Sequence, residues 1–270
     1  MTSVAADSNP ALNVTMNGLP ASSRYASGGP RPPLGTINAL FFDAVERFDR
    51  ADALSTKVRG VWEPMSHRTI MERVRRTALG LADMGIVAQD RVAILSENRP
   101  EWLIADFACI CSAITDVPIY PTLPADQLPY LLKDSGARAI FVSNADQAKK
   151  VASIRSEVPG LQWIIGFAAT KADGCDFTLA DIEAKGAALD NAERATTFKR
   201  DALAVTPDQL VTLIYTSGTT GNPKGVMLTQ DNLYSNVIAT KTTLHVSTSD
   251  LALSFLPLSH IFERTGDYFL

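Results

Sequence analysis

The chain of 270 residues is expected to fold as an α/β protein, with a mostly parallel sheet covered by helices. Short apolar runs rich in Val, Ile and Leu alternate with longer segments whose apolar residues recur at helical spacing. Strands separated by such helices pair in parallel through crossover connections and are then buried on both faces. The hydrophobic content of 46% is enough for a sizeable core, in one large domain or two small ones.

The first ordered element is expected to begin at Thr36, a suitable N-cap. Residues 1–35 before it are rich in Ser, Ala, Pro, Gly and Asn and are predicted to be a disordered tail. The helix after Thr36 has its apolar residues on one face, namely Leu40, Phe41, Ala44, Val45 and Phe48. Trp62 lies in a short extended segment, and Thr69 and Glu72 have the spacing of a capping box for a second helix that ends at Gly85.

From residue 91 onward, strands and helices alternate along the chain. The expected strands are residues 91–95, 117–120, 139–142, 161–165, 210–215 and 251–256. The expected helices are residues 100–113, 124–135, 145–156, 179–188 and 229–245. A further helix is expected to begin near His260, with Ile261, Phe262 and Phe269 on its apolar face.

Composition excludes several classes of function. A net charge of −4 argues against a general nucleic-acid binder, which is usually basic. Cys109, Cys111 and Cys175 lack metal-site spacing and are typical of reduced core residues in a cytoplasmic protein. The longest apolar stretch, residues 102–114, contains Asp106 and is too short to cross a membrane, so it is expected to be a buried helix.

The segment with the most chemical information follows the strand at 210–215. Residues 215–225 read Tyr-Thr-Ser-Gly-Thr-Thr-Gly-Asn-Pro-Lys-Gly. Glycines allow backbone N–H groups to converge on an anion, hydroxyls add donors, and one lysine adds a point charge. The spacing is not that of the P-loop of kinases and GTPases, because Gly225 stands where that motif has Ser or Thr. Composition alone leaves phosphate binding and a flexible surface loop as alternatives.

The order of these residues resembles the signature of the adenylate-forming (AMP-binding) superfamily, which includes acyl-CoA synthetases, adenylation domains of peptide synthetases and luciferases. Residues 253–264 read Leu-Ser-Phe-Leu-Pro-Leu-Ser-His-Ile-Phe-Glu-Arg and resemble the long-chain acyl-CoA synthetase version of the next family motif. The resemblance covers about residue 36 to the end. It implies that the chain is an N-terminal part of the large domain of such an enzyme.

The resemblance implies a reaction in which a fatty acid carboxylate attacks the α-phosphate of ATP, and coenzyme A then displaces AMP. The residues implied to wrap the β- and γ-phosphates are Ser217, Gly218, Thr219, Thr220 and Gly221. Thr216 matches the position whose hydroxyl meets Mg²⁺, and Lys224 the position that steadies the loop or the leaving pyrophosphate. His260 is implied to position groups and stabilise charge rather than to act as a nucleophile.

Fatty acid, ATP and coenzyme A are the implied partners; nucleic acid is not. A cytoplasmic location is expected, and a fatty acid substrate is compatible with peripheral contact with a membrane. The family's Tyr-Gly-x-Thr-Glu segment, its ribose-binding Asp and its C-terminal lysine are not in this sequence. The chain is therefore expected to be an incomplete synthetase without turnover of its own. Two alternatives remain open: a synthetase for an aryl or amino acid, and a non-catalytic nucleotide-binding or scaffolding fragment.

Overall fold

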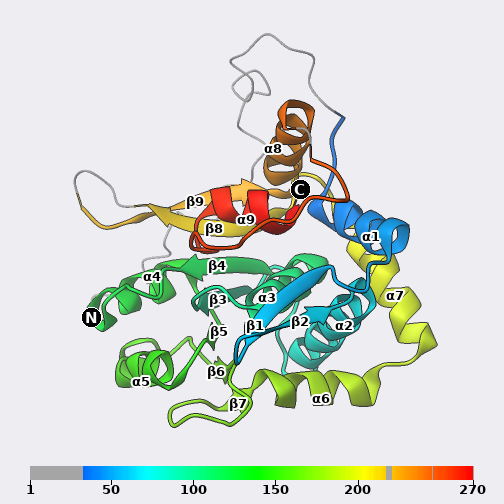
Figure 1. Cartoon of the computed structure of the whole chain (residues 1–270). Helices are drawn as coiled ribbons and strands as arrows, with labels where there is room; N and C mark the ends of the chain where they lie inside the picture. Colours follow the sequence, from blue (N-terminus) through cyan, green and yellow to red (C-terminus); the bar gives the residue numbers. More distant parts are fainter. Residues whose placement is uncertain (1–32, 217–220, 245, 270) are drawn as a thin grey trace. The chain divides into compact units, whose positions relative to one another are not determined.

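The computed structural model describes residues 33–216, 221–244 and 246–269, so almost all of the predicted tail at 1–35 lies outside the described residues. The main sheet of the described part has the strand order β7-β6-β5-β3-β4-β8-β9 (Figure 1). Its strands are β3 (Arg91–Leu95), β4 (Thr115–Ile119), β5 (Ala139–Val142), β6 (Trp163–Gly166), β7 (Phe177–Thr178), β8 (Leu210–Thr216) and β9 (Lys224–Thr229). Neighbouring strands are parallel except for β8 and β9, which confirms the mostly parallel α/β fold.

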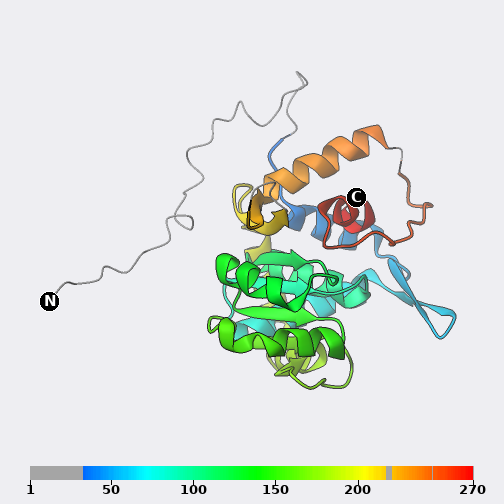
Figure 2. The ribbon, with the colours of Figure 1, turned by 90° about the vertical axis from the view of Figure 1, so that its left-hand side faces the viewer.

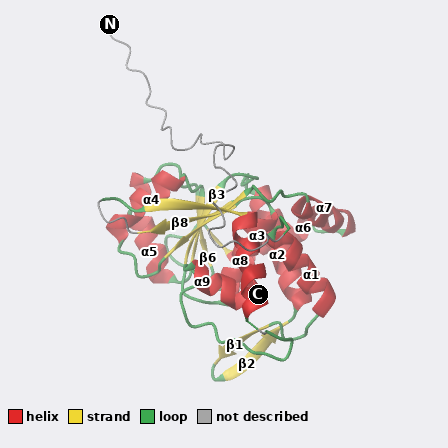
Figure 3. Ribbon diagram, turned by 90° about the horizontal axis from the view of Figure 1, so that it is seen from above, coloured by secondary structure: helices red, strands yellow, loops and turns green. Residues whose placement is uncertain are grey.

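Helices cover both faces of this sheet (Figure 3). One face is packed by α4 (Leu128–Ser135) and α5 (Ala145–Ser153), whose leucines, alanines and valines join the inward side chains of β3, β4 and β5. The opposite face is packed by α2 (His67–Asp83), α3 (Pro100–Cys111) and α6 (Leu179–Leu189). The remaining long helices are α1 (Ile37–Phe48), α7 (Ala192–Leu203) and α8 (Gln230–Thr243). Together with α3 they form a further apolar cluster, separate from the two on the faces of the sheet.

The strands predicted at 91–95 and 139–142 are confirmed residue for residue. The helix predicted at 145–156 ends earlier, at Ser153, and is followed by a short 3₁₀ turn, η5 (Arg155–Glu157). In the predicted helix at 124–135, the first turn is likewise 3₁₀, η4 (Ala125–Gln127). The elements α7, β7 and β9 were not predicted: α7 carries few apolar residues, β7 has two residues, and β9 lies inside the segment that was interpreted as the phosphate loop.

Two expectations for the first helices need correction. The N-cap of α2 is Ser66, whose hydroxyl accepts the Thr69 N–H, so the helix begins before the predicted Thr69–Glu72 capping box. Thr36 does cap α1, accepting from the Ala39 N–H. The buried face of α1, however, is formed by Ile37, Asn38, Phe41 and Phe42, and Phe48 is exposed. Between α1 and α2 the chain forms an antiparallel hairpin, β1 (Leu54–Val58) and β2 (Val61–Met65), and Trp62 lies on β2.

The helices α2 and α6 approach each other closely at two glycines. A Cβ added to Gly80 would lie 2.1 Å from the Ile182 carbonyl oxygen, and one added to Gly186 would lie 1.8 Å from the Arg76 carbonyl oxygen. Either side chain would overlap with backbone atoms, which cannot move without separating the two helices. The two glycines therefore set the distance between α2 and α6.

The strand predicted at 251–256 is wrong. These residues have no strand partner in the described part of the chain, and Figure 2 shows the chain between α8 and α9 as a long loop. Leu251, Leu253 and Phe255 are 94%, 70% and 73% exposed, so their alternation does not correspond to a buried strand face. After this loop come the helical turn α9 (Ile261–Arg264) and a π-helical turn, η6 (Thr265–Phe269).

The apolar face predicted for the helix near His260 is only partly correct. Phe269 is buried against Phe107, but Phe262 is 68% exposed. The buried positions next to it are instead occupied by the charged side chains of Glu263 and Arg264. The helix predicted at 100–113 is buried as expected. Within the residues the structure describes, no helix is both long enough and apolar enough to cross a membrane.

Candidate functional site

Two of the predicted phosphate-binding residues lie opposite each other at the loop end of a β-hairpin. Strands β8 and β9 are antiparallel, and their register pairs Thr216 with Lys224. Both residues are exposed. Gly221 has a φ of +151°, a backbone conformation that favours glycine. The other predicted loop residues, Ser217, Gly218, Thr219 and Thr220, lie outside the described residues. The hairpin therefore brings Thr216, Gly221 and Lys224 to the two ends of the predicted phosphate loop.

Packing at the end of β8 explains how the hairpin is held. Leu213 points into the core shared with α4 and α5. The Tyr215 hydroxyl donates to Asp134 Oδ2 at 2.6 Å, and its ring lies over Gly225, where an added Cβ would be 3.3 Å from the ring. Burial and the Asp134 carboxylate raise the pKa of Tyr215, so the phenol stays protonated. Tyr215 thus joins the end of β8 to α4 at the base of the loop.

His260 is the N-cap of α9, and its side chain is exposed. Its Nδ1 accepts the N–H of Phe262 at 3.2 Å. A neutral imidazole that accepts at Nδ1 carries its proton at Nε2, so the free nitrogen is a hydrogen-bond donor. A donor of this kind suits the predicted role in charge stabilisation better than nucleophilic attack. Among the hydrogen bonds and ion pairs of the described residues, none joins His260 directly to Thr216 or Lys224.

The loop before His260 is held by two side chains. Asn98, which follows β3, donates to Ser254 Oγ at 2.9 Å and to the Leu256 carbonyl at 2.7 Å, and it accepts the Leu258 N–H at 2.9 Å. Glu263 is buried, and its Oε1 accepts the N–H groups of Phe255 and Leu256 at 3.0 and 3.1 Å. These contacts replace the strand pairing that the loop lacks.

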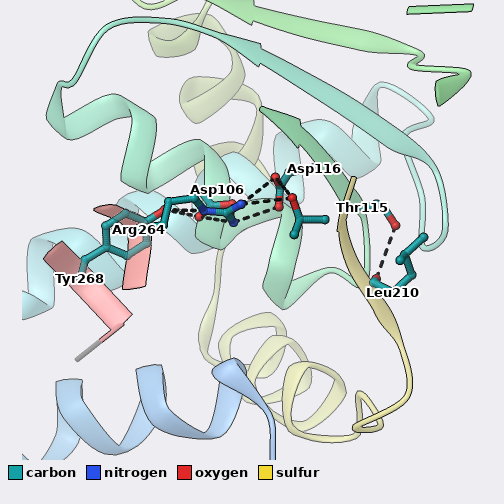
Figure 4. A network of polar contacts seen from close by, with 7 residues as sticks. Asp106, Thr115, Asp116, Leu210, Arg264 and Tyr268 are labelled. Carbon is teal, nitrogen blue, oxygen red and sulfur yellow. Dashed lines mark hydrogen bonds and ion pairs between the residues drawn. The ribbon is translucent and has the colours of Figure 1, made fainter. Parts of the chain in front are cut away.

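A buried ion network lies next to this turn, and sequence reasoning missed it (Figure 4). Arg264 is fully buried, and its Nη2 donates to Asp106 Oδ1 at 2.8 Å and Oδ2 at 2.9 Å. The same guanidinium donates to both Asp116 oxygens, at 3.2 and 3.1 Å, and to Thr212 Oγ1 at 3.1 Å. Tyr268 donates to Asp106 Oδ2, and its hydroxyl accepts from Arg264 Nε at 3.3 Å. The only sequence signal was Asp106 inside an apolar helix.

The network has two carboxyl groups for one guanidinium. Burial raises the pKa of Asp106 to about 8, although Arg264 acts in the opposite direction. Burial alone would lower the pKa of Arg264, but the carboxylates of Asp106 and Asp116 outweigh it and raise that pKa well above its usual value. The rings of Trp102 and Phe269 lie 5.3 and 5.4 Å from the guanidinium carbon. Arg264 therefore stays charged, and the two buried carboxyl groups share its guanidinium.

The described residues include no group of three or more His, Cys, Asp or Glu side chains arranged to hold a metal ion. Mg²⁺ does not require one, because it keeps several waters and binds through one or two protein groups together with substrate phosphates. The exposed hydroxyl of Thr216 at the end of β8 fits such a site. The three cysteines are free thiols; burial raises the pKa of Cys109 and Cys111, and Cys175 is half-buried.

Two surface hollows of about 380 and 570 Å³ are not part of this arrangement. The first lies between α4 and the turn after η5, and the second beside β7 and α6. Neither is lined by Thr216, Gly221, Lys224 or His260. The candidate site thus consists of the loop end of the β8–β9 hairpin and of His260 with the helix α9, called the His260 turn below. Neither part lies in either of these hollows.

Comparison with known proteins shows which family the chain belongs to. The family model described as "AMP-binding enzyme" matches residues 41–270. The chain belongs to this family. It is 37% identical over 210 residues to the long-chain-fatty-acid–CoA ligase FadD15 of Mycobacterium bovis, covering 77% of this chain and 34% of that protein. It is 31% identical over 245 residues to the peroxisomal long chain acyl-CoA synthetase 7 of Arabidopsis thaliana, covering 87% of this chain and 34% of that protein.

The fold also matches solved structures of AMP-binding enzymes. A long-chain-fatty-acid-CoA ligase from Archaeoglobus fulgidus aligns with a TM-score of 0.72 at 21% sequence identity, covering 90% of this chain and 47% of that structure. The chain thus spans about a third of the length of the curated relatives it matches and about half of the solved enzyme. The predicted family and fold class are confirmed.

Proposed function

We propose that this chain supplies the ATP-phosphate-binding part of an AMP-forming ligase that activates a long-chain fatty acid, first to an acyl-adenylate and then to acyl-CoA. The observation that carries the proposal is the pairing of Thr216 with Lys224 at the two ends of the loop 217–223. The family membership and the names of the similar curated proteins support the reaction and the acid class.

In the proposed reaction, the carboxylate of the acid attacks the α-phosphorus of ATP, and the bond to the leaving pyrophosphate breaks. Two anions must approach each other, so the site has to offset negative charge. Lys224 supplies a mobile positive charge at the start of β9, and Thr216 supplies a hydroxyl at the end of β8. Bound Mg²⁺ would neutralise charge on the phosphate oxygens, with Thr216 as its protein contact.

His260 is proposed to donate from Nε2 to an oxygen that gains negative charge during the transfer. The proposal needs no proton abstraction by His260, because a fatty acid is already a carboxylate at neutral pH. Displacement of AMP by the thiol of coenzyme A would complete the reaction. In this second step the thiol loses its proton to solvent, a C–S bond forms, the acyl C–O bond breaks, and AMP leaves with the electron pair.

Equilibrium binding of MgATP to the purified chain tests the phosphate site. Lys224→Met and Thr216→Val should each weaken binding by about 10- to 100-fold, because a hydrogen bond to a charged group contributes about 1.5–3 kcal/mol. Lys241→Met, which changes an exposed lysine on α8, is the matched control and should bind as wild type does. Equal affinities for all four proteins would place the phosphates elsewhere.

The acid class can be tested without turnover. Unreactive acyl-adenylate mimics, with a sulfamoyl group in place of the phosphate, can carry a palmitoyl, a benzoyl or an aminoacyl group. Tighter binding of the palmitoyl mimic is expected. Preference for the benzoyl or aminoacyl mimic would replace the fatty acid by that class of substrate, and absence of binding to every mimic would favour a non-catalytic role.

A further inference from the structure

The His260 turn cannot hold its own position. The helix α9 has four residues, and a helix of that length has no stability by itself. His260 at its N-cap is exposed, whereas Arg264 at its last position is completely buried. One helical turn thus connects a side chain at the candidate site to an anchor inside the protein.

The side chain of Arg264 contacts three separate elements of the fold. Arg264 contacts Asp106 on α3, Asp116 on β4 and Thr212 on β8. The Thr212 hydroxyl also donates to Asp116 Oδ1 at 2.7 Å, so a single chain of hydrogen bonds joins β4, β8 and α9. Residues alternate in direction along a strand, and Thr212 therefore shares a face of β8 with Thr216. Arg264 touches the same strand that leads to the predicted phosphate loop.

We propose that Arg264 is a positioning residue, which fixes the His260 turn, and with it the imidazole, relative to β8, the strand that ends at Thr216. This inference rests on the proposed function for its meaning in catalysis, but the anchoring itself does not depend on it. The planar fork of a guanidinium fixes direction as well as distance, which an ammonium group does not. Buried ion pairs are a weak source of net stability and are best attested as devices that specify one arrangement.

Contacts on the other side of His260 support this role. Asn98 and Glu263 fix residues 254–258 before the turn, and the contacts of Arg264 fix the last residue of α9. His260 is therefore the exposed point between two anchored segments. Its Nδ1 is already engaged by Phe262 N–H, so the direction of Nε2 follows from the position of the turn.

Nuclear magnetic resonance of the full 270-residue chain with ¹⁵N-labelled histidine tests the anchoring. The chain has three histidines, and the His260 signals can be assigned with a His260→Gln variant. In the wild-type protein, neutral His260 should show the nitrogen shifts of a fixed Nε2–H tautomer. Arg264→Met should replace them with the averaged shifts of two tautomers, and exchange of the Phe262 amide hydrogen should become about tenfold faster or more.

Two further variants separate positioning from general stability. Arg155→Met removes a different arginine from an ion pair, with Asp176 at 2.9 Å, and should leave the His260 tautomer unchanged. Arg264→Lys retains the positive charge but lacks the planar guanidinium. It should therefore fold as the wild-type protein does, and its His260 signals should lie between those of the wild type and of Arg264→Met. Wild-type His260 signals and wild-type Phe262 exchange in Arg264→Met would overturn the proposal. If that variant does not fold, Thr212→Val decides in the same way, because it removes the hydroxyl that links Arg264 to β8.

Binding of MgATP to the same variants connects the anchor to the phosphate loop. Arg264→Met should bind MgATP roughly tenfold more weakly than Arg155→Met, since without the hydrogen bond from Arg264 to Thr212 the turn no longer holds β8. Equal binding by the two variants would overturn the link to the loop. If the wild-type chain fails to bind MgATP, the proposed function fails, and the histidine signals still decide whether Arg264 anchors the turn.

Discussion

Replacement of Asp106 by asparagine should change how the stability of the protein depends on pH. The Asp106 carboxyl is completely buried, and its pKa is raised from 3.8 to about 8. Between these values the folded protein is expected to keep a proton that the unfolded chain releases. A group with a raised folded-state pKa contributes its full stability below the unfolded value, and this contribution falls as the pH rises toward the folded value.

The size of the effect follows from this proton. One extra proton in the folded state lowers the free energy of unfolding by about 1.4 kcal/mol for each unit of pH, or about 2.7 kcal/mol between pH 5 and pH 7. Asparagine has the shape of the protonated carboxyl, and its oxygen can still accept from Arg264, but it has no proton to lose. The Asp106→Asn protein should therefore lack this part of the pH dependence.

Urea unfolding followed by circular dichroism at pH 5, 6, 7 and 8 measures the difference. Other groups with raised pKa, such as Glu183 and Asp267, contribute equally to both proteins and cancel in the comparison. The wild-type protein should lose stability relative to Asp106→Asn as the pH rises. Parallel curves over this range would show that Asp106 is ionised in the folded protein and that the network carries no extra proton.

Two further perturbations address the loop at 254–258 and the contact between α2 and α6. Asn98→Ala removes three hydrogen bonds to that loop and should cost about 3 kcal/mol in unfolding free energy; limited proteolysis should cut the loop faster, and unchanged cleavage would contradict its role as a clamp. Gly186→Ala places a Cβ 1.8 Å from the Arg76 carbonyl oxygen and should lower the free energy of unfolding by about 1–3 kcal/mol or more, measured by thermal melting. Gly160→Ala meets no atom within 4 Å and is the control; equal melting of the two variants would refute the packing argument.

Local sequence patterns were sufficient for much of the sheet. Residues 91–95 and 139–142 are short apolar runs, and the structure buries nearly every side chain in them. The same reasoning failed for residues 251–256, where Leu251, Leu253 and Phe255 alternate with smaller side chains. Alternation predicts which side chains share a face, but a strand also needs a neighbouring strand, and that depends on the whole fold.

The candidate site was predictable only where its residues are close in sequence. The loop after β8 was proposed as a phosphate site because the order of its residues is distinctive, and the hairpin places Thr216 and Lys224 at the two ends of this loop. The anchor of His260 was not found, because Asp106 and Arg264 are separated by 158 positions and no local pattern relates them. A carboxylate in the middle of an apolar helix, as Asp106 is in α3, was the one usable hint of a distant partner.

The distances along the chain within the Arg264 network have a consequence for the order in which the protein assembles. Arg264 follows Asp106 by 158 residues, Asp116 by 148 and Thr212 by 52. During synthesis, α3 and β4 are therefore complete long before their cationic partner leaves the ribosome. Until then, two carboxyl groups must stay hydrated or take up protons, since an unpaired buried charge is costly. The closing of this network is expected to be a late step, and the sheet should reach its final packing only when Arg264 arrives.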